Sequence, residues 1–310
     1  MKKHAVVAGG AGFIGSHLTK RLLKLGYKVT VIDSLITGDI GNLAKEVGHP
    51  GLTIEIEDIR YCSMTGLNKV DLVFNLACPA SPKDYQEYPI HTLETCSVGT
   101  QVLLDLAAKN KARYIHASTS EVYGNPLEHP QKETYFGNVN PYGPRACYDE
   151  GKRYAEALIY SYHHEYGVNT GIARIFNTYG PGMRVGDGRV VSNFIQQALV
   201  GEPLTIYGRG GQTRSFCYID DMVDGLLLLA KSREESPINL GNPAEFTIVE
   251  LARMVLKITG STSDTTFQPL PVDDPVQRKP DISKAKELLG FEPKVNLAEG
   301  IKLMIEEKEL

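Results

Sequence analysis

Short apolar runs alternate with longer amphipathic segments through the first 176 residues of the chain. The runs are typical of buried strands in a parallel sheet, and the segments between them carry apolar residues at helical spacing. The predicted strands are residues 4–8, 28–32, 52–56, 71–76, 113–117 and 168–175. The predicted helices follow the first strand as far as Gly26, run from Ile90 to Lys109, and run through Tyr148 to about Tyr166. This order predicts an α/β fold with a Rossmann-type doubly wound parallel sheet.

Beyond Asn177 the strict alternation ends, and loops rich in glycine and arginine appear at residues 180–189 and 207–214. Such loops are often no more than solvated turns, but after a nucleotide fold they favour a phosphorylated ligand. We therefore expect residues 1–176 to form a dinucleotide-binding domain. Residues 177–310 should form mainly a smaller C-terminal substrate-binding lobe, with a segment at about 215–242 returning to the first domain. The lobe is predicted to include helices at 248–258, 283–289 and 297–308 and a strand near Asn239.

A glycine loop follows the first strand and leads into the first helix. Gly9 permits a tight turn, Gly12 lets the backbone approach a pyrophosphate, and Gly15 allows close helix packing. Asp33 ends the second strand, where an acid accepts hydrogen bonds from the adenosine ribose, and no arginine follows it directly, which favours NAD over NADP. A glycine loop alone is as often structural, but the loop, the helix and Asp33 together predict NAD binding. The further predicted cofactor residues are Phe13, Ile14, Ser34, Thr37, Gly38, Asp58, Ile59, Leu76 and Ala77.

Tyr148 and Lys152 are four residues apart, so on a helix their side chains lie on one face. An ammonium beside a phenol favours the phenolate, which would lower the pKa of Tyr148 and make it a general base. The pair is also predicted to contact the cofactor. In a chain with 16 tyrosines this spacing also occurs by chance, so it supports a catalytic role only together with the rest of the sequence.

Composition excludes several other classes of function. The apolar fraction is 42%, the charged fraction 23% and the net charge −4, which argues for a globular protein without an electrostatic footprint for nucleic acid. No run approaches the ~20 apolar residues of a membrane span. The N-terminus leads straight into the first strand, which leaves no room for a signal peptide. Five scattered cysteines predict free thiols in a reducing cytosol and no metal site, and Cys147 is expected to have a packing role.

Six sequence blocks carry a resemblance to a known family. They are residues 75–82 (NLACPASP), 118–124 (STSEVYG), 145–153 (RACYDEGKR), 174–181 (RIFNTYGP), 187–194 (DGRVVSNF) and 278–282 (RKPDI). With the glycine loop, they make the whole chain similar to the nucleotide-sugar enzymes of the extended short-chain dehydrogenase group. Within that group it most resembles the UDP-glucuronate decarboxylases.

The resemblance implies an NAD-dependent reaction in which carbon 4 of a UDP-glucuronate sugar is oxidised and carbon dioxide then leaves from carbon 5. Reduction by the same cofactor would give UDP-xylose. It places Tyr148 and Lys152 at carbon 4 with Thr119, and Ser120, Glu121 and Arg278 near the sugar carboxylate. Glu121, Arg278 or a water could then supply the carbon-5 proton. The other implied substrate residues are Asn177, Arg189, Val190, Val191, Asn193, Thr205, Tyr207 and Arg214, and Thr178 and Arg184 are implied on the cofactor side.

Three alternatives remain open at this point. A nucleotide-sugar 4,6-dehydratase carries Asp at the position of Ser120, and a 4-epimerase usually lacks a carboxylate at that of Glu121. A non-catalytic NAD sensor would be expected to have lost Tyr148 or Lys152. The resemblance also implies a homodimer formed by the helices at 90–109 and 147–166. A cytoplasmic location is expected, because eukaryotic relatives carry an N-terminal membrane anchor and this chain begins at its first strand.

Overall fold

A computed structural model describes residues 2–184 and 186–308 of the chain. Its centre is a seven-stranded sheet in the order β11-β6-β5-β4-β1-β2-β3, in which every neighbouring pair is parallel. The strands are β1 (His4–Ala8), β2 (Lys28–Ile32), β3 (Leu52–Glu55), β4 (Leu72–Asn75), β5 (Arg113–Thr119), β6 (Thr170–Ile175) and β11 (Pro237–Leu240). The predicted doubly wound parallel sheet is confirmed.

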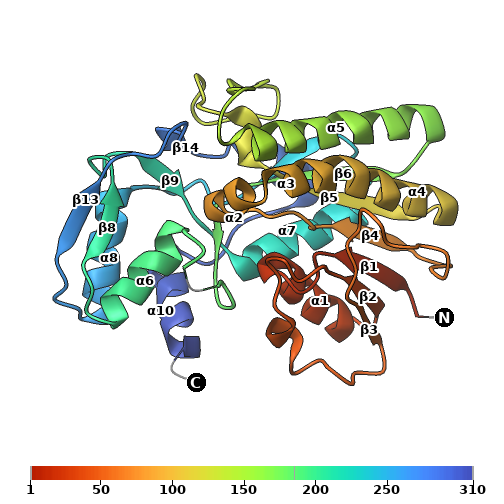
Figure 1. Ribbon diagram of the computed structural model, residues 1–310, viewed down its shortest axis with the longest axis horizontal. Helices are drawn as coiled ribbons and strands as arrows, with labels where there is room; N and C mark the ends of the chain where they lie inside the picture. The colour runs from red at the N-terminus through yellow and green to blue at the C-terminus, as the bar shows by residue number, and fades with distance from the viewer. Residues whose placement is uncertain (1, 185, 309–310) are drawn as a thin grey trace.

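Helices cover both faces of this sheet (Figure 1). One face carries α1 (Phe13–Lys24) and α7 (Ile219–Lys231), and the other carries α4 (Thr100–Asn110) and α5 (Ala146–Tyr166). The side chains of β1 alternate between the two resulting cores. Ala5 and Val7 pack into the core that includes α1 and α7, whereas Val6 and Ala8 pack into the core that includes α4 and α5. A strand buried on both faces must be apolar at every position, which accounts for the uninterrupted apolar run.

The helix predicted from Ile90 to Lys109 is present but not uniform. It consists of α3 (Pro89–Glu94), a π-helical turn (Thr95–Gly99) and α4. Another helix, α2 (Pro82–Glu87), was not predicted; Ser81 caps it, accepting a hydrogen bond from the backbone N–H of Asp84. The π turn adds one residue to a helical turn and so changes which side chains face α5.

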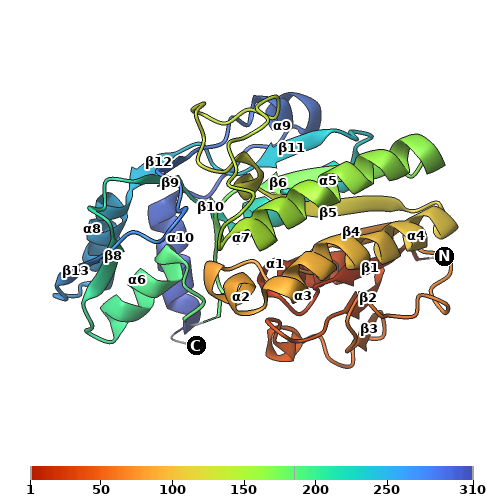
Figure 2. The same ribbon diagram turned by 45° about the horizontal axis from the view of Figure 1, so that its top comes forward.

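Most of the remaining elements form the second lobe, to one side of the main sheet (Figure 2). Its helices are α6 (Val190–Leu199), α8 (Ile248–Thr259) and α10 (Leu297–Lys308), whereas α9 (Ser283–Leu289) lies beside the main sheet and packs against β11 and α7. Its strands are β7 (Thr178–Tyr179), β8 (Leu204–Tyr207), β9 (Thr213–Ser215), β10 (Cys217–Tyr218), β12 (Glu245–Thr247), β13 (Thr265–Gln268) and β14 (Gln277–Arg278). Of these, α6 and all seven strands were not predicted, although α8, α9 and α10 were.

The chain returns from the lobe to the main sheet through α7 and β11. Strand β11 pairs with β6, and α7 packs against α1, β5 and β6. The exact division into two domains stays a prediction. Met1 and Val185, which belong to the predicted first domain and to the predicted loop at 180–189, lie outside the described residues. Among the described residues, no helix is long and apolar enough to cross a membrane.

Candidate active site

A cavity of about 1120 Å³ lies at the carboxyl ends of the central strands and is walled by both parts of the molecule. This is where parallel sheets place their ligands. Of the residues predicted for the site, Asn193 and Arg278 are absent from the cavity walls, and all the others line them. Asn193 belongs to α6, whose Val190 and Val191 do reach the cavity. Arg278 lies behind the wall, 1% exposed, where it contacts Glu121.

The glycine turn forms one end of the cavity. Gly9 has a φ of +76°, and a side chain there would meet the backbone of Leu76 at 2.6 Å. A side chain at Gly15 would lie 2.0 Å from the carbonyl oxygen of Gly9, so the helix can approach the turn this closely only without one. Gly12 caps α1 with no side-chain hydrogen bond, and the first helical turn holds no acidic residue. The free backbone N–H groups and the helix dipole therefore fit the pyrophosphate of NAD.

Asp33 lies at the end of β2, beside this turn. One carboxylate oxygen accepts a hydrogen bond from the backbone N–H of Ala11 and the other from that of Leu35, each at 2.9 Å. Burial raises the pKa of Asp33, and the backbone hydrogen bonds oppose the shift. The carboxylate is thereby fixed in the cavity wall with Ser34, Thr37 and Gly38, an arrangement that fits the ribose hydroxyls of NAD and would repel a 2′-phosphate.

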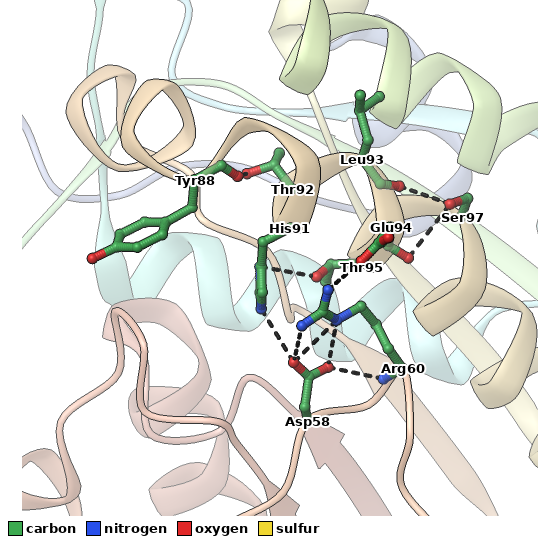
Figure 3. A network of polar contacts seen from close by, with 9 residues as sticks. All are labelled: Asp58, Arg60, Tyr88, His91, Thr92, Leu93, Glu94, Thr95 and Ser97. Atoms are coloured by element: carbon green, nitrogen blue, oxygen red, sulfur yellow. Dashed lines mark hydrogen bonds and ion pairs between the residues drawn. The ribbon is translucent and has the colours of Figure 1, made fainter.

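Asp58 lies on the same side of the cavity but is already part of an ion-pair network (Figure 3). Arg60 donates to its carboxylate through Nε at 3.0 Å and Nη2 at 2.7 Å, and also contacts Glu94. His91 of α3 lies 3.2 Å from the same carboxylate and lines the cavity. Burial opposes ionisation, but the hydrogen bonds from Arg60 lower the pKa of Asp58. Arg60 and His91 were not predicted, because nothing in the sequence shows that α3 lies over this strand end.

Tyr148 and Lys152 lie on one face of α5 and both line the cavity, as their spacing predicts. The ammonium of Lys152 is 5.8 Å from the centre of the Tyr148 ring and donates to the carbonyl oxygen of Ala117 at 2.8 Å. The expected lowering of the Tyr148 pKa is wrong for this structure. Burial raises that pKa well above its usual value, and Cys78 and Glu121 add to the shift while a hydrogen bond with Thr119 opposes it.

The ring of Tyr85 from α2 stacks on that of Tyr148, with centroids 4.9 Å apart and planes 8° apart. This contact fixes the orientation of the phenol. Tyr85 was not among the predicted site residues. Its only sequence signal was its position just after the NLACPASP block.

Glu121 follows β5 in a short 3-10 turn (Ser120–Tyr123), opposite Tyr148. One of its oxygens accepts hydrogen bonds from Arg145 at 2.7 Å and from Arg278 at 3.1 Å. Burial alone would raise the pKa of Glu121, but Arg278, Arg145 and Arg214 together lower it to about 2. Glu121 is therefore a carboxylate at neutral pH and has no proton to give to carbon 5.

Arg145 contacts several residues of the site but was not predicted from the sequence. It lines the cavity, lies 5.8 Å over the ring of Tyr85, and reaches Asp149 at 3.8 Å and Asp274 at 3.6 Å. Its position three residues before Tyr148 in the RACYDEGKR block was the available signal. Burial and then Glu121 raise the pKa of Asp149 to about 7, although Arg145 opposes the shift.

The far end of the cavity is basic and belongs to the second lobe. Arg214 of β9 pairs with Asp274 at 2.8 Å, and Arg189 lies 3.6 Å from Asp187. Arg184 contacts Asp84 of α2. Asn177, Thr178, Thr205 and Tyr207 complete this part of the wall. These groups suit an anionic, hydroxyl-rich ligand that extends from the sheet into the lobe.

Comparison with known proteins places the chain in a family. The family described as "NAD dependent epimerase/dehydratase family" matches residues 5–241. The chain belongs to this family. UDP-glucuronic acid decarboxylase 3 of Arabidopsis thaliana is 53% identical over 306 residues, which cover 98% of this chain and 89% of the relative.

Two solved structures of the epimerase/dehydratase fold superpose closely. UDP-glucose 4-epimerase of Thermotoga maritima, solved with UDP-glucose, has a TM-score of 0.91 and 32% identity and covers 99% of this chain and 98% of its own. UDP-glucuronic acid 4-epimerase of Bacillus cereus, solved with UDP-glucuronic acid and NAD, has a TM-score of 0.88 and 31% identity, with 99% of each chain covered.

The raised pKa of Asp149 predicts a pH-dependent cost to stability. In the folded state the Asp149 carboxyl keeps its proton up to about pH 7, whereas in the unfolded chain it loses the proton near ~3.9. The free energy of unfolding therefore falls as pH rises between these two values. We expect Asp149→Asn to raise the melting temperature relative to the parent at about pH 8 by a few degrees more than at about pH 4. Differential scanning fluorimetry across this range measures it. A constant difference between variant and parent would show that Asp149 does not titrate there.

Proposed function

We propose that this member of the epimerase/dehydratase family is an NAD-dependent decarboxylase that converts UDP-glucuronate to UDP-xylose and recycles its cofactor. The observation that carries the proposal is the ionised Glu121, which two arginines hold in the same cavity wall as Tyr148 and Lys152. The same cavity ends at the glycine turn on one side and at the basic lobe on the other. The decarboxylase relatives that match nearly the whole chain support the choice of substrate.

When bound, NAD would supply reversible hydride transfer at carbon 4 of the sugar, and the positive charge of its oxidised form would lower the pKa of Tyr148 from the raised value of the ligand-free site. Tyr148 then acts as a phenolate that takes the proton of the carbon-4 hydroxyl, with Thr119 in hydrogen-bond contact. Lys152 supplies a fixed positive charge, held by the carbonyl oxygen of Ala117. The high intrinsic pKa of the buried phenol then suits the next step, since a protonated Tyr148 donates a hydrogen bond to the enolate oxygen left when carbon dioxide departs.

Glu121 acts on the substrate carboxylate by charge. The sugar acid must lose its carboxylate as neutral carbon dioxide, and an ionised neighbour in a poorly hydrated cavity disfavours the anionic ground state. Arg145 and Arg278 keep Glu121 ionised, and Arg145 also lines the cavity where it can orient the incoming anion. Arg278 has no cavity surface, so we assign it to positioning Glu121. The carbon-5 proton then comes from water, since Glu121 is ionised and a guanidinium keeps its protons.

The test of this function is incubation of the purified protein with UDP-glucuronate and NAD. Carbon dioxide and a UDP-pentose should appear in equal amounts while absorbance at 340 nm shows no net accumulation of NADH. A UDP-hexuronic acid of inverted configuration at carbon 4 would instead identify a 4-epimerase, like the structural neighbour from Bacillus cereus. A 4,6-dehydratase would leave UDP-glucuronate unconverted, because this substrate has no carbon-6 hydroxyl to expel, and would instead form a 4-keto-6-deoxy sugar from UDP-glucose.

Tyr148→Phe should retain binding of NAD and UDP-glucuronate within about threefold but lose at least about 100-fold in kcat, because it removes the proton acceptor and keeps the stacked ring. Isothermal titration calorimetry and the carbon dioxide assay measure the two effects. Tyr162→Phe is the matched control, since Tyr162 lies on the same helix but outside the cavity wall, and its hydroxyl donates to Asp105 of α4. Near-parental turnover by Tyr148→Phe would remove Tyr148 from the mechanism.

Glu121→Gln should lower kcat by about 10-fold or more and change KM less, because the amide keeps the shape of the side chain and loses its charge. Stopped-flow absorbance should also show NADH forming, since oxidation at carbon 4 precedes the step that Glu121 assists. Glu250→Gln serves as the control: Glu250 is an exposed residue of a capping box on α8, away from the cavity. A parental rate of carbon dioxide release would contradict the role given to Glu121.

We further propose that two copies of the chain associate through α3, α4 and α5. These helices pack side by side, and exposed apolar side chains lie on α3 (Ile90 and Leu93), on the π turn between α3 and α4 (Val98) and on α5 (Tyr154 and Tyr160). Pairing two such faces would form a four-helix interface and remove the apolar groups from water. The cytoplasmic location expected from the sequence stays a prediction.

The dimer predicts a solution mass of about twice 34.1 kDa by light scattering. Val98→Arg should shift the mass towards that of one chain, because it places a charge in the centre of the apolar face. Val47→Arg introduces the same change at another exposed valine, outside these helices, and should leave the dimer intact. A parental mass of one chain would refute the proposed interface.

A further inference from the structure

Two cysteine thiols meet beside the proposed catalytic pair. Cys78 follows β4 and lines the cavity, and Cys96 lies in the π-helical turn between α3 and α4. Their sulfur atoms are 3.5 Å apart, although 18 residues separate them in the chain. The π turn accounts for this contact, because its extra residue changes the direction in which the side chain of Cys96 points. Figure 3 shows the neighbouring Thr95 and Ser97 of the same turn.

Cys96 also packs against α5, the helix that carries Tyr148 and Lys152. It is 2% exposed, and its Cβ and sulfur atoms both lie 3.2 Å from where a side chain on Gly151 would begin. Gly151 lies directly before Lys152 and three residues after Tyr148. Any movement of the Cys96 sulfur is therefore transmitted to the turn of α5 that carries the proposed base and its ammonium partner.

The charge around the thiols favours reaction. A hydrogen bond from Cys78 and then the ammonium of Lys152 lower the pKa of Cys96, although burial opposes the shift. Burial raises the pKa of Cys78, which is accordingly the hydrogen-bond donor of the pair. The lowered pKa of Cys96 increases its fraction of thiolate, the reactive form of cysteine, and so suits it to attack an oxidised Cys78. The cavity gives small molecules a route to Cys78.

We propose that Cys78 and Cys96 form a modification site for hydroperoxides, at which a reversible disulfide switches the enzyme off. In the first step the sulfur of Cys78, which a peroxide reaches through the cavity, attacks the peroxide oxygen; the O–O bond breaks, the thiol proton goes to the leaving oxygen, and a sulfenic acid at Cys78 and water (or an alcohol) result. The second thiol then attacks the sulfenic sulfur, water leaves, and the S–S bond forms. In balance, two thiols and one hydroperoxide give one disulfide, one alcohol or water, and one further water. A dithiol reductant reverses the change by thiol–disulfide exchange.

The disulfide would act on both walls of the site at once. It pulls Cys78, next to the predicted cofactor residues Leu76 and Ala77, towards Cys96, whose packing against Gly151 supports the Tyr148–Lys152 turn. A misplacement of about 1 Å in a catalytic group is enough to cost a large factor in rate. The oxidised protein should therefore lose at least about 10-fold in kcat.

The experiment treats the reduced full-length protein with hydrogen peroxide and counts thiols after denaturation. The five cysteines should fall to three, and peptide mass spectrometry should find Cys78 joined to Cys96. Turnover of UDP-glucuronate should fall and return on addition of dithiothreitol. The thiol count and the peptide mass do not depend on the proposed function, so a failure of that function and a failure of this site are distinguishable.

Cys96→Ser is the deciding variant, and Cys217→Ser is its matched control because Cys217 is buried elsewhere, against the backbone of Tyr218. Each variant begins with four thiols. Cys96→Ser should form no disulfide, whereas Cys217→Ser should still lose two thiols to the disulfide between Cys78 and Cys96. Cys96→Ala provides a second variant if serine prevents folding. The proposal is overturned if the parent keeps all five thiols, if the disulfide joins any other pair or two chains, or if the disulfide forms without loss of turnover.

Discussion

The site depends on the buried carboxylate of Glu121, which stays ionised there only because positively charged partners surround it. An ionised Glu121 in the wall of the cavity would be driven to its neutral form by burial, and two guanidinium groups on a single oxygen prevent this. The partners come from distant parts of the chain: Arg145 opens α5, and Arg278 belongs to β14 of the second lobe. Removing either would leave a poorly compensated charge, which costs more than the pair itself contributes.

The parallel sheet determines which residues can meet around that carboxylate. Strands β1, β2, β4 and β5 all end at the same edge, so the glycine turn, Asp33, Ala77 and Glu121 reach one cavity without any of them being close in sequence. The register of β9 with β14 then sets Arg214 directly beside Arg278. Two guanidinium groups side by side repel each other, and Asp274 and Glu121 offset that repulsion. The second lobe is thus joined to the sheet by charge as well as by apolar packing.

The features that the sequence predicted best are those determined by the geometry of a few neighbouring residues. Gly9 and Gly15 could be assigned because each backbone position there excludes a side chain, and Tyr148 and Lys152 because a helix places residues four apart on one face. The strands of the main sheet were found within two residues for the same reason. The helix α7 was missed although its apolar run and its acidic first turn, Asp220 and Asp221, gave a local signal.

What the sequence could not show was the environment of each charge. The interpretation of Tyr148 considered its neighbour Lys152 and not its burial, and burial is the larger effect on the phenol. Tyr85, Arg145 and Asp149 were missed as partners because their roles depend on how α2 and the start of α5 pack against each other. The π turn at Thr95–Gly99 has only Gly99 as a local signal, and one glycine does not predict a π turn, so nothing in the sequence indicated that Cys78 and Cys96 are in contact.

The ion cluster has a consequence for how the two parts of the molecule act together. Glu121 and Arg145 belong to the sheet side, whereas Arg278, Arg214 and Asp274 belong to the lobe. Because the lobe supplies two of the three arginines that lower the pKa of Glu121, the carboxylate is strongly acidic only while the lobe is docked. If the lobe moved away, burial would be relieved and the pKa would return towards its ordinary value near ~4.3. The docked lobe therefore supplies Tyr207 and Arg189 to the cavity wall and Arg278 and Arg214 to the field that lowers the pKa of Glu121, so the substrate-contacting and the charge-balancing residues depend on the same docking.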